Sequence, residues 1–144
     1  MTRVDFYRLP AAGSEAVERA ACLVAGKAYR AGYHVRIFAD SDQLDALDEK
    51  LWTYRPGAFV PHARRDRVDP DWPEPVVLAD DCRENGGAQV LICVVPPPAD
   101  CLDGFQRVAE FVTQDDPVRE AARQRYAAYR QAGHELHAHD LRLN

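Results

Sequence analysis

The sequence lacks the long apolar run that a membrane-spanning helix requires. Its longest apolar stretch, Val90 to Val95, ends at three consecutive prolines and is far shorter than the ~20 residues that cross a bilayer. The first residues lack the apolar core of a signal peptide, and an acidic residue, Asp5, follows almost at once. We therefore expect a protein without membrane contact that works in the cytoplasm.

Closely spaced cysteines are also missing. The four cysteines lie far apart without a C-x-x-C pair, which disfavours both a zinc ribbon and a redox dithiol. The simplest expectation is that all of them are reduced thiols, mostly buried: Cys22, Cys82, Cys93 and Cys101.

The common nucleotide and hydrolase motifs are absent as well. The connection after the first predicted strand contains one glycine, Gly13, where a dinucleotide fingerprint needs three. Neither of the two lysines follows a glycine-rich turn, and no G-x-S-x-G run occurs. We expect no cofactor and no active site.

The composition is that of one folded unit. The chain has 144 residues, of which 47% are hydrophobic and 28% charged, enough for one core of ordinary size. We therefore expect a single domain over residues 1–144. The net charge of -5 gives no overall attraction for a phosphate backbone. Any contact with nucleic acid, single-stranded DNA included, is therefore expected to be local or indirect.

Short apolar runs alternate with amphipathic patterns along the chain. This order predicts an α/β fold, with a mostly parallel but mixed sheet flanked by helices, Rossmann-like without the dinucleotide fingerprint. Residues 63–75 read as a polar, proline-rich loop, and 85–87 as a turn between two strands. The expected strands are 4–9, 34–39, 76–79, 89–95 and 108–113, and the expected helices begin near 14, 40 and 116 and end near 31, 54 and 131.

The last predicted helix carries a stripe of arginines. At about 100° per residue, its members fall within about 60° of one another: Arg119, Arg123, Tyr126 and Arg130. Planar guanidinium groups beside an aromatic ring suit a carboxylate or phosphate attached to an apolar group. The alternative is a solvated helix face whose arginines pair with nearby acids.

The side of this helix that lies about 100° around from the arginine stripe is predicted to face the sheet. Arg125 lies in the middle of that apolar side, so either its stem reaches outward or the predicted orientation is rotated. The residues expected to point inward are Val118, Ala122, Tyr129 and Ala132.

A second candidate site follows the second predicted helix. Trp52 lies off the leucine stripe of that helix, and Pro56 and Phe59 follow closely. Such a cluster is typical of a protein-binding surface, although large aromatic residues are just as often buried in a core.

The C-terminal histidines offer a possible metal site. In a strand, His137 and His139 would share one face, with His134 and Asp140 nearby. The spacing matches no structural zinc pattern, so an exposed terminal segment and no metal is the preferred interpretation. A small α/β nucleotide- or metal-binding enzyme remains the alternative function.

Taken in order, several motifs of this chain resemble the chi subunit of bacterial DNA polymerase III. The resemblance covers nearly the whole chain and is loose between about 63 and 90. It is carried by Asp5-Phe6-Tyr7, Leu51-Trp52, Arg55-Pro56, Phe59-Val60-Pro61-His62, Phe111-Val112, Ala122-Arg123, Arg125-Tyr126, Ala128-Tyr129-Arg130 and Ala132-Gly133.

This resemblance implies a non-catalytic adaptor in DNA replication. Chi subunits join the clamp loader through the psi subunit and bind the acidic C-terminal tail of the single-stranded DNA-binding protein (SSB), which ends in an apolar residue with a free carboxylate. By the matched motifs, Arg123 and Tyr126 would form the core of the tail site, with Arg119 and Arg130 as flanking charge and Val112 as an apolar wall. Psi or another partner would contact Trp52, Pro56 and Phe59.

Overall fold

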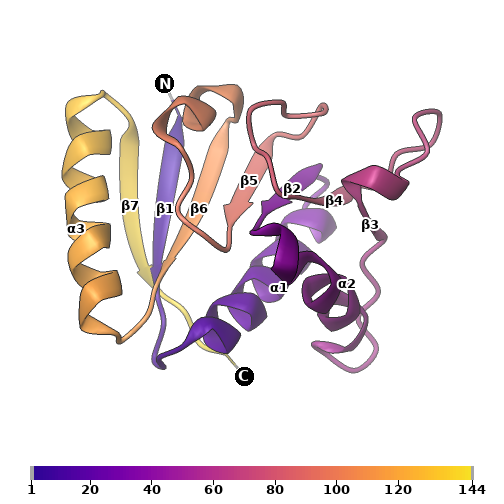
Figure 1. The fold of residues 1–144 in the computed structure, drawn as a ribbon, viewed down its shortest axis with the longest axis horizontal. Helices are drawn as coiled ribbons and strands as arrows, with labels where there is room; N and C mark the ends of the chain where they lie inside the picture. Colours follow the sequence, from indigo (N-terminus) through magenta and orange to yellow (C-terminus); the bar gives the residue numbers. More distant parts are fainter. Residues whose placement is uncertain (1, 144) are drawn as a thin grey trace.

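The computed structural model describes residues 2–143, in which seven strands form one sheet with the order β3-β4-β2-β5-β6-β1-β7 (Figure 1). The strands are β1 (Arg3–Arg8), β2 (Val35–Phe38), β3 (His62–Arg64), β4 (Val76–Ala79), β5 (Val90–Cys93), β6 (Arg107–Val112) and β7 (Glu135–Asp140). The helices are α1 (Ser14–Arg30), α2 (Leu44–Thr53) and α3 (Asp116–Gln131), with short 3-10 helices η1 (Ser41–Gln43), η2 (Arg65–Arg67) and η3 (Ala99–Gly104).

The predicted α/β fold is confirmed, but the mixed character of the sheet is wrong. Every strand pair within residues 2–143 is parallel. The turn at 85–87 forms no hairpin, because β2 lies between β4 and β5 in the sheet. Parallel neighbours need a long crossover, and a tight turn therefore cannot join adjacent strands here.

Helices cover both faces of the sheet. The core on one face includes α1 and α2, and the predicted stripe of α2 is buried in it from Leu44 through Leu47 and Leu51 to Tyr54. The core on the other face includes α3 and β1, with Phe6 and Tyr129 among its members. Figure 1 shows α3 at the β7 end of the sheet and α2 at the β3 end.

Two edge strands were not predicted. β3 (His62–Arg64) extends into residues 63–75, where the sequence indicated a polar loop, and β7 takes up the C-terminal segment expected to be an exposed tail. β3 has only 3 residues, and the apolar residues of β7 are just Leu136 and Ala138 on one face, so neither has the strong apolar alternation that marks a half-buried strand in the sequence. Backbone pairing holds them: β4 pairs with β3, and β1 with β7.

The expectation of four reduced cysteines is wrong for two of them. Cys82 and Cys101 form a disulfide, with their Cα atoms 5.7 Å apart. It joins the loop after β4 to η3. Cys22 and Cys93 are buried free thiols, as expected, and burial raises the pKa of Cys22 to about 12.

No helix within residues 2–143 combines the length and apolar character needed to cross a membrane.

Candidate functional site

Helix α3 buries only part of the face that its sequence predicts to point inward. Ala122 and Tyr129 are buried as expected, whereas Val118 and Ala132 are exposed, so their predicted inward placement is wrong. The inward face is centred on Ala122 and Tyr129, with half-buried Arg125 and Tyr126 on either side, and the Nε of Arg125 lies 2.8 Å from Oε1 of Glu110. Glu110 is only 1% exposed, and a buried carboxylate needs such a partner. This pair holds Arg125 inward and withdraws its charge from the surface.

A groove runs between α3 and the end of the sheet formed by β1, β6 and β7. We call it the α3 groove; its volume is about 490 Å³. The exposed stripe of α3 forms one wall, and alternate residues of β1 reach the floor because side chains of a strand point to one face at every second position. The groove is lined by Phe6, Arg8, Val112, Arg119, Ala122, Arg123, Tyr126 and Ala138.

Three arginines surround the α3 groove, and the acidic partners of two of them are solvent-exposed. Arg119 forms no ion pair within residues 2–143. The Nη1 atom of Arg123 lies 3.2 Å from Glu120 Oε2, and Arg8 Nε lies 2.8 Å from Oδ1 of Asp140. The hydrogen bond from Arg8 lowers the pKa of the Asp140 carboxyl. Exposed pairs of this kind contribute little to stability, so a ligand carboxylate can replace them at low cost.

The floor of the groove is apolar. The rings of Phe6 and Tyr126 lie 5.5 Å apart between their centroids, and Val112 and Ala122 continue the apolar surface. A groove with guanidinium groups at its rim and aromatic rings at its floor can hold an anion next to an apolar side chain.

The structure brings together four of the five residues predicted for this site: Val112, Arg119, Arg123 and Tyr126. Arg130 is exposed on α3 but does not line the groove. The groove residues not predicted for this site are Phe6, Arg8, Ala122 and Ala138. The i, i+2 spacing of Phe6 and Arg8 predicts that they share a face, but their place beside α3 depends on the order of the strands.

The second predicted surface is also exposed. Trp52 is 51% and Phe59 63% exposed, and their ring centroids lie 5.6 Å apart, with exposed Pro56 nearby in the chain. We call these three residues the aromatic patch. The ring of buried His62 lies 4.5 Å from that of Trp52 and hydrogen-bonds to backbone oxygens of Val60 and Asp48. Buried His62 therefore packs against Trp52 and helps to fix the position of its ring in the patch.

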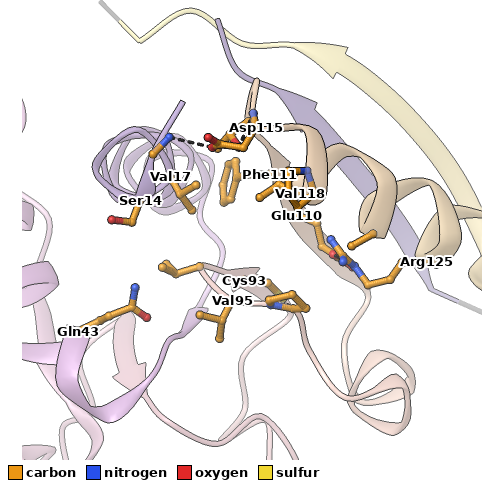
Figure 2. A pocket seen from close by; sticks show the side chains of 16 residues that line it. Ser14, Val17, Gln43, Cys93, Val95, Glu110, Phe111, Asp115, Val118 and Arg125 are labelled. Carbon is orange, nitrogen blue, oxygen red and sulfur yellow. Dashed lines mark hydrogen bonds and ion pairs between the residues drawn. The ribbon is translucent and has the colours of Figure 1, made fainter. Parts of the chain in front are cut away.

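A cavity of about 410 Å³ lies at the carboxyl ends of β5 and β6, where parallel α/β sheets often bind ligands (Figure 2). The Asp115 carboxylate accepts hydrogen bonds from the Gly13 backbone N–H at 3.0 Å and from Thr113 Oγ1 at 2.7 Å. These bonds lower the pKa of Asp115. A phosphate at the start of α1 would meet this charge, which disfavours the alternative of a nucleotide site.

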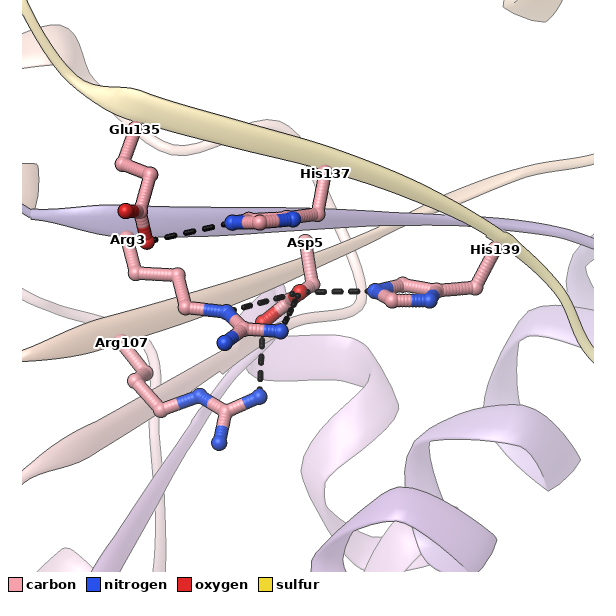
Figure 3. A network of polar contacts seen from close by, with 6 residues as sticks. All are labelled: Arg3, Asp5, Arg107, Glu135, His137 and His139. Carbon is pink, nitrogen blue, oxygen red and sulfur yellow. Dashed lines mark hydrogen bonds and ion pairs between the residues drawn. The ribbon is translucent and has the colours of Figure 1, made fainter.

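The C-terminal histidines take part in a polar network instead of forming a metal cluster. Asp5, which is buried, lies within 2.8 Å of His139 Nε2 and 3.0 Å of Arg107 Nη2, and Arg3 also contacts it (Figure 3). His137 pairs with Glu135. Within residues 2–143 no three His, Cys, Asp or Glu side chains are grouped as metal ligands would be.

Fold and sites together define an α/β protein with an all-parallel sheet and two exposed surfaces at opposite ends of it. The chain belongs to the DNA polymerase III chi subunit family: the family described as "DNA polymerase III chi subunit, HolC" matches residues 1–137.

Three relatives named DNA polymerase III subunit chi are similar over most of their length. The chain is 37% identical to the protein of Pseudomonas aeruginosa over 142 residues, covering 98% of both chains. It is 36% identical to that of Escherichia coli over 126 residues, covering 86% of this chain and 85% of the relative. For Haemophilus influenzae the identity is 31% over 134 residues, covering 92% of each.

Proposed function

We propose that this protein is a non-catalytic adaptor of DNA polymerase III that binds the acidic C-terminal tail of SSB in the α3 groove and the psi subunit at the aromatic patch. The observation that carries the proposal is that one groove contains three arginines and an apolar floor. The arginines are Arg8, Arg119 and Arg123, and the floor includes the rings of Phe6 and Tyr126. Relatives bear the name of a polymerase subunit, and such a subunit needs protein partners.

The chemistry of the tail suits the α3 groove. Its terminal carboxylate would accept hydrogen bonds from the guanidinium groups of Arg119 and Arg123, and its last side chain would lie on Tyr126 and Val112. The acidic residues before it would be attracted by the local excess of arginine, which stands out in a chain with net charge -5. We expect micromolar affinity, about -8 kcal/mol, that weakens as salt screens the exposed arginines.

Calorimetry with a peptide copying the SSB tail tests this assignment. Arg123→Ala should lose about 1–3 kcal/mol of binding free energy, because a charged hydrogen-bonding partner is removed. Its melting temperature should stay unchanged, since the pair with Glu120 is exposed. Arg30→Ala, an exposed arginine at the end of α1, is the matched control and should bind normally. Unchanged affinity in Arg123→Ala would remove the assignment.

The aromatic patch has the exposed aromatic area that protein interfaces concentrate at their centres. Psi is the proposed partner here, because the patch lies at the β3 end of the sheet and the tail site at the β7 end. One protein could then hold both partners at once.

Co-purification with psi tests the second surface. Trp52→Ala should abolish psi binding, because truncating a central aromatic anchor removes much of an interface's binding energy, and should leave binding of the SSB tail peptide intact. Trp72→Ala serves as the control, since Trp72 is 80% exposed and lies outside the patch. Full psi binding by Trp52→Ala would contradict this role.

A further inference from the structure

Arg36 on β2 is a buried arginine without an acidic partner. The residue is 7% exposed and forms no ion pair within residues 2–143. Its Nη1 donates to the backbone oxygen of Glu84 at 2.9 Å, and its Nε is buried with no hydrogen-bond acceptor. Burial lowers the pKa of Arg36 most and neighbouring Arg65 lowers it further, whereas the charges of Glu84 and Asp81 raise it without coming into ion-pair contact. A buried guanidinium with no carboxylate in direct contact is costly, and this one lines a cavity.

The turn before β5 is shaped around this guanidinium. Gly86 has φ 58°, and a Cβ atom built on it would lie 2.2 Å from Arg36 Nη2. The turn is fixed by Asn85, whose side chain accepts from the Gly87 N–H at 2.8 Å and donates to the Gly104 oxygen at 2.9 Å. Arg36 is therefore held in place by surrounding backbone.

The cavity next to Arg36 contains a further unsatisfied polar group. Its volume is about 400 Å³, and Arg65, His34 and Glu74 also line it. Arg65 is half-exposed, and its acidic contact, Asp81, is as far as 3.9 Å away. Glu74 Oε2 is buried with no donor. We call this cavity the Arg36 pocket; its apolar walls are Val35, Val68, Pro70, Pro73, Pro75, Val77 and Ala88.

We propose that the Arg36 pocket binds a small phosphate monoester that also carries a hydroxyl or amino group. Two guanidinium groups suit the nearly double negative charge of a phosphate monoester better than a single carboxylate. Glu74 would accept a hydrogen bond from the hydroxyl or amino group, and the proline and valine walls would contact the ligand's apolar surface. The volume is within the usual range for small-molecule sites.

Calorimetry and thermal melting of the whole chain test the proposal with three probes: inorganic phosphate, ribose 5-phosphate and AMP. At least one of the two monoesters should bind saturably and more tightly than inorganic phosphate. Arg65→Gln should weaken that binding about tenfold or more, the usual effect of losing a charged hydrogen bond. Glu74→Gln should weaken monoester binding and leave binding of inorganic phosphate unchanged. Arg67→Gln, exposed in the same short helix but outside the pocket lining, should behave as wild type.

Arg36→Met separates a ligand-binding role from a purely structural one. If Arg36 exists to bind an anion, removing its unpaired buried charge should leave the melting temperature of the free protein unchanged or raised, while abolishing the response to every probe. A lower melting temperature combined with no response of the wild type to any probe would overturn the proposal. Binding that survives Arg36→Met would also overturn it.

The remaining rival is that Arg36 and Glu74 pair with each other in solution. A double-mutant cycle between Arg36→Met and Glu74→Gln, measured on stability without any probe, decides this point. Additive effects on stability would agree with Arg36 and Glu74 not interacting in the free protein. Strong coupling would overturn the proposal, because the two side chains would then neutralise each other without a ligand.

Discussion

Two buried carboxylates, Asp5 and Glu110, lie on opposite faces of the sheet and are neutralised in different ways. Within residues 2–143, Glu110 forms one ion pair, with Arg125 at 2.8 Å. Burial raises the pKa of nearby Tyr129, and the charge of Glu110 raises it further. Asp5 is shared by Arg3, Arg107 and His139. Neither carboxylate lies in the two proposed protein-binding surfaces, so both serve the fold.

Asp5 should make the stability of the protein sensitive to acid. Burial raises its pKa, but hydrogen bonds from His139, Arg107 and Arg3 outweigh burial, so the pKa is lower than the ordinary value of 3.8. A carboxyl with a lowered folded-state pKa stabilises the protein above its unfolded pKa, and this contribution is lost as the pH falls through the folded value. Stability should therefore decline below about pH 4 to 5.

Urea unfolding across the acid range measures this dependence. Asp5→Asn should be less stable at neutral pH and show a flatter loss of stability toward low pH, because the titrating group is gone. Asp42→Asn, an exposed acid in η1, should keep the wild-type slope. An equal acid slope in Asp5→Asn and the wild type would show that Asp5 does not carry the effect.

Among the elements, those with strong periodicity could be predicted from the sequence and those held by backbone pairing could not. The apolar stripe of α2 predicts a helix, and the continuous apolar run of β5 predicts a buried strand. β3 and β7 contain few apolar residues, and only the neighbouring strands explain them. The same limit applies to the site: the arginine stripe of α3 is visible in the sequence, whereas Phe6 and Arg8 join it only because β1 lies beside β7.

The orientation of α3 was the least predictable feature within an element. Helical spacing placed Arg125 on the inward side but could not supply its partner, because Glu110 lies 15 residues earlier on β6. The pair with Glu110 accounts for the half-buried arginine on the inward side of this helix, whereas Val118 and Ala132, near its two ends, are exposed.

The Cys82–Cys101 disulfide joins the loop that follows β4 to η3, and the two cysteines are 19 residues apart in the sequence. By the entropy of closing a loop of that length, reduction should lower the free energy of unfolding by about 3 kcal/mol. Urea unfolding with and without a reductant measures the loss. Thiol titration of the denatured protein provides the check: two free thiols, Cys22 and Cys93, are expected without reductant, and finding all four would contradict the disulfide.

For the whole molecule, the order of the strands separates the two proposed binding surfaces. The α3 groove uses β1, β6 and β7, and the aromatic patch lies between α2 and β3 at the far end of the sheet. Distant sites without shared partners usually act additively. We therefore expect the SSB tail and psi to bind independently, as an adaptor that links two proteins requires.

The most direct measurement of the central claim is an NMR titration of the isotope-labelled protein with the SSB tail peptide. The account predicts that the largest shift changes fall on the α3 groove, at Arg8, Val112, Arg119, Arg123 and Tyr126, and that the peptide with an amidated C-terminus produces much smaller ones. Largest changes at Trp52 and Phe59, or equal changes with the amidated peptide, would contradict it.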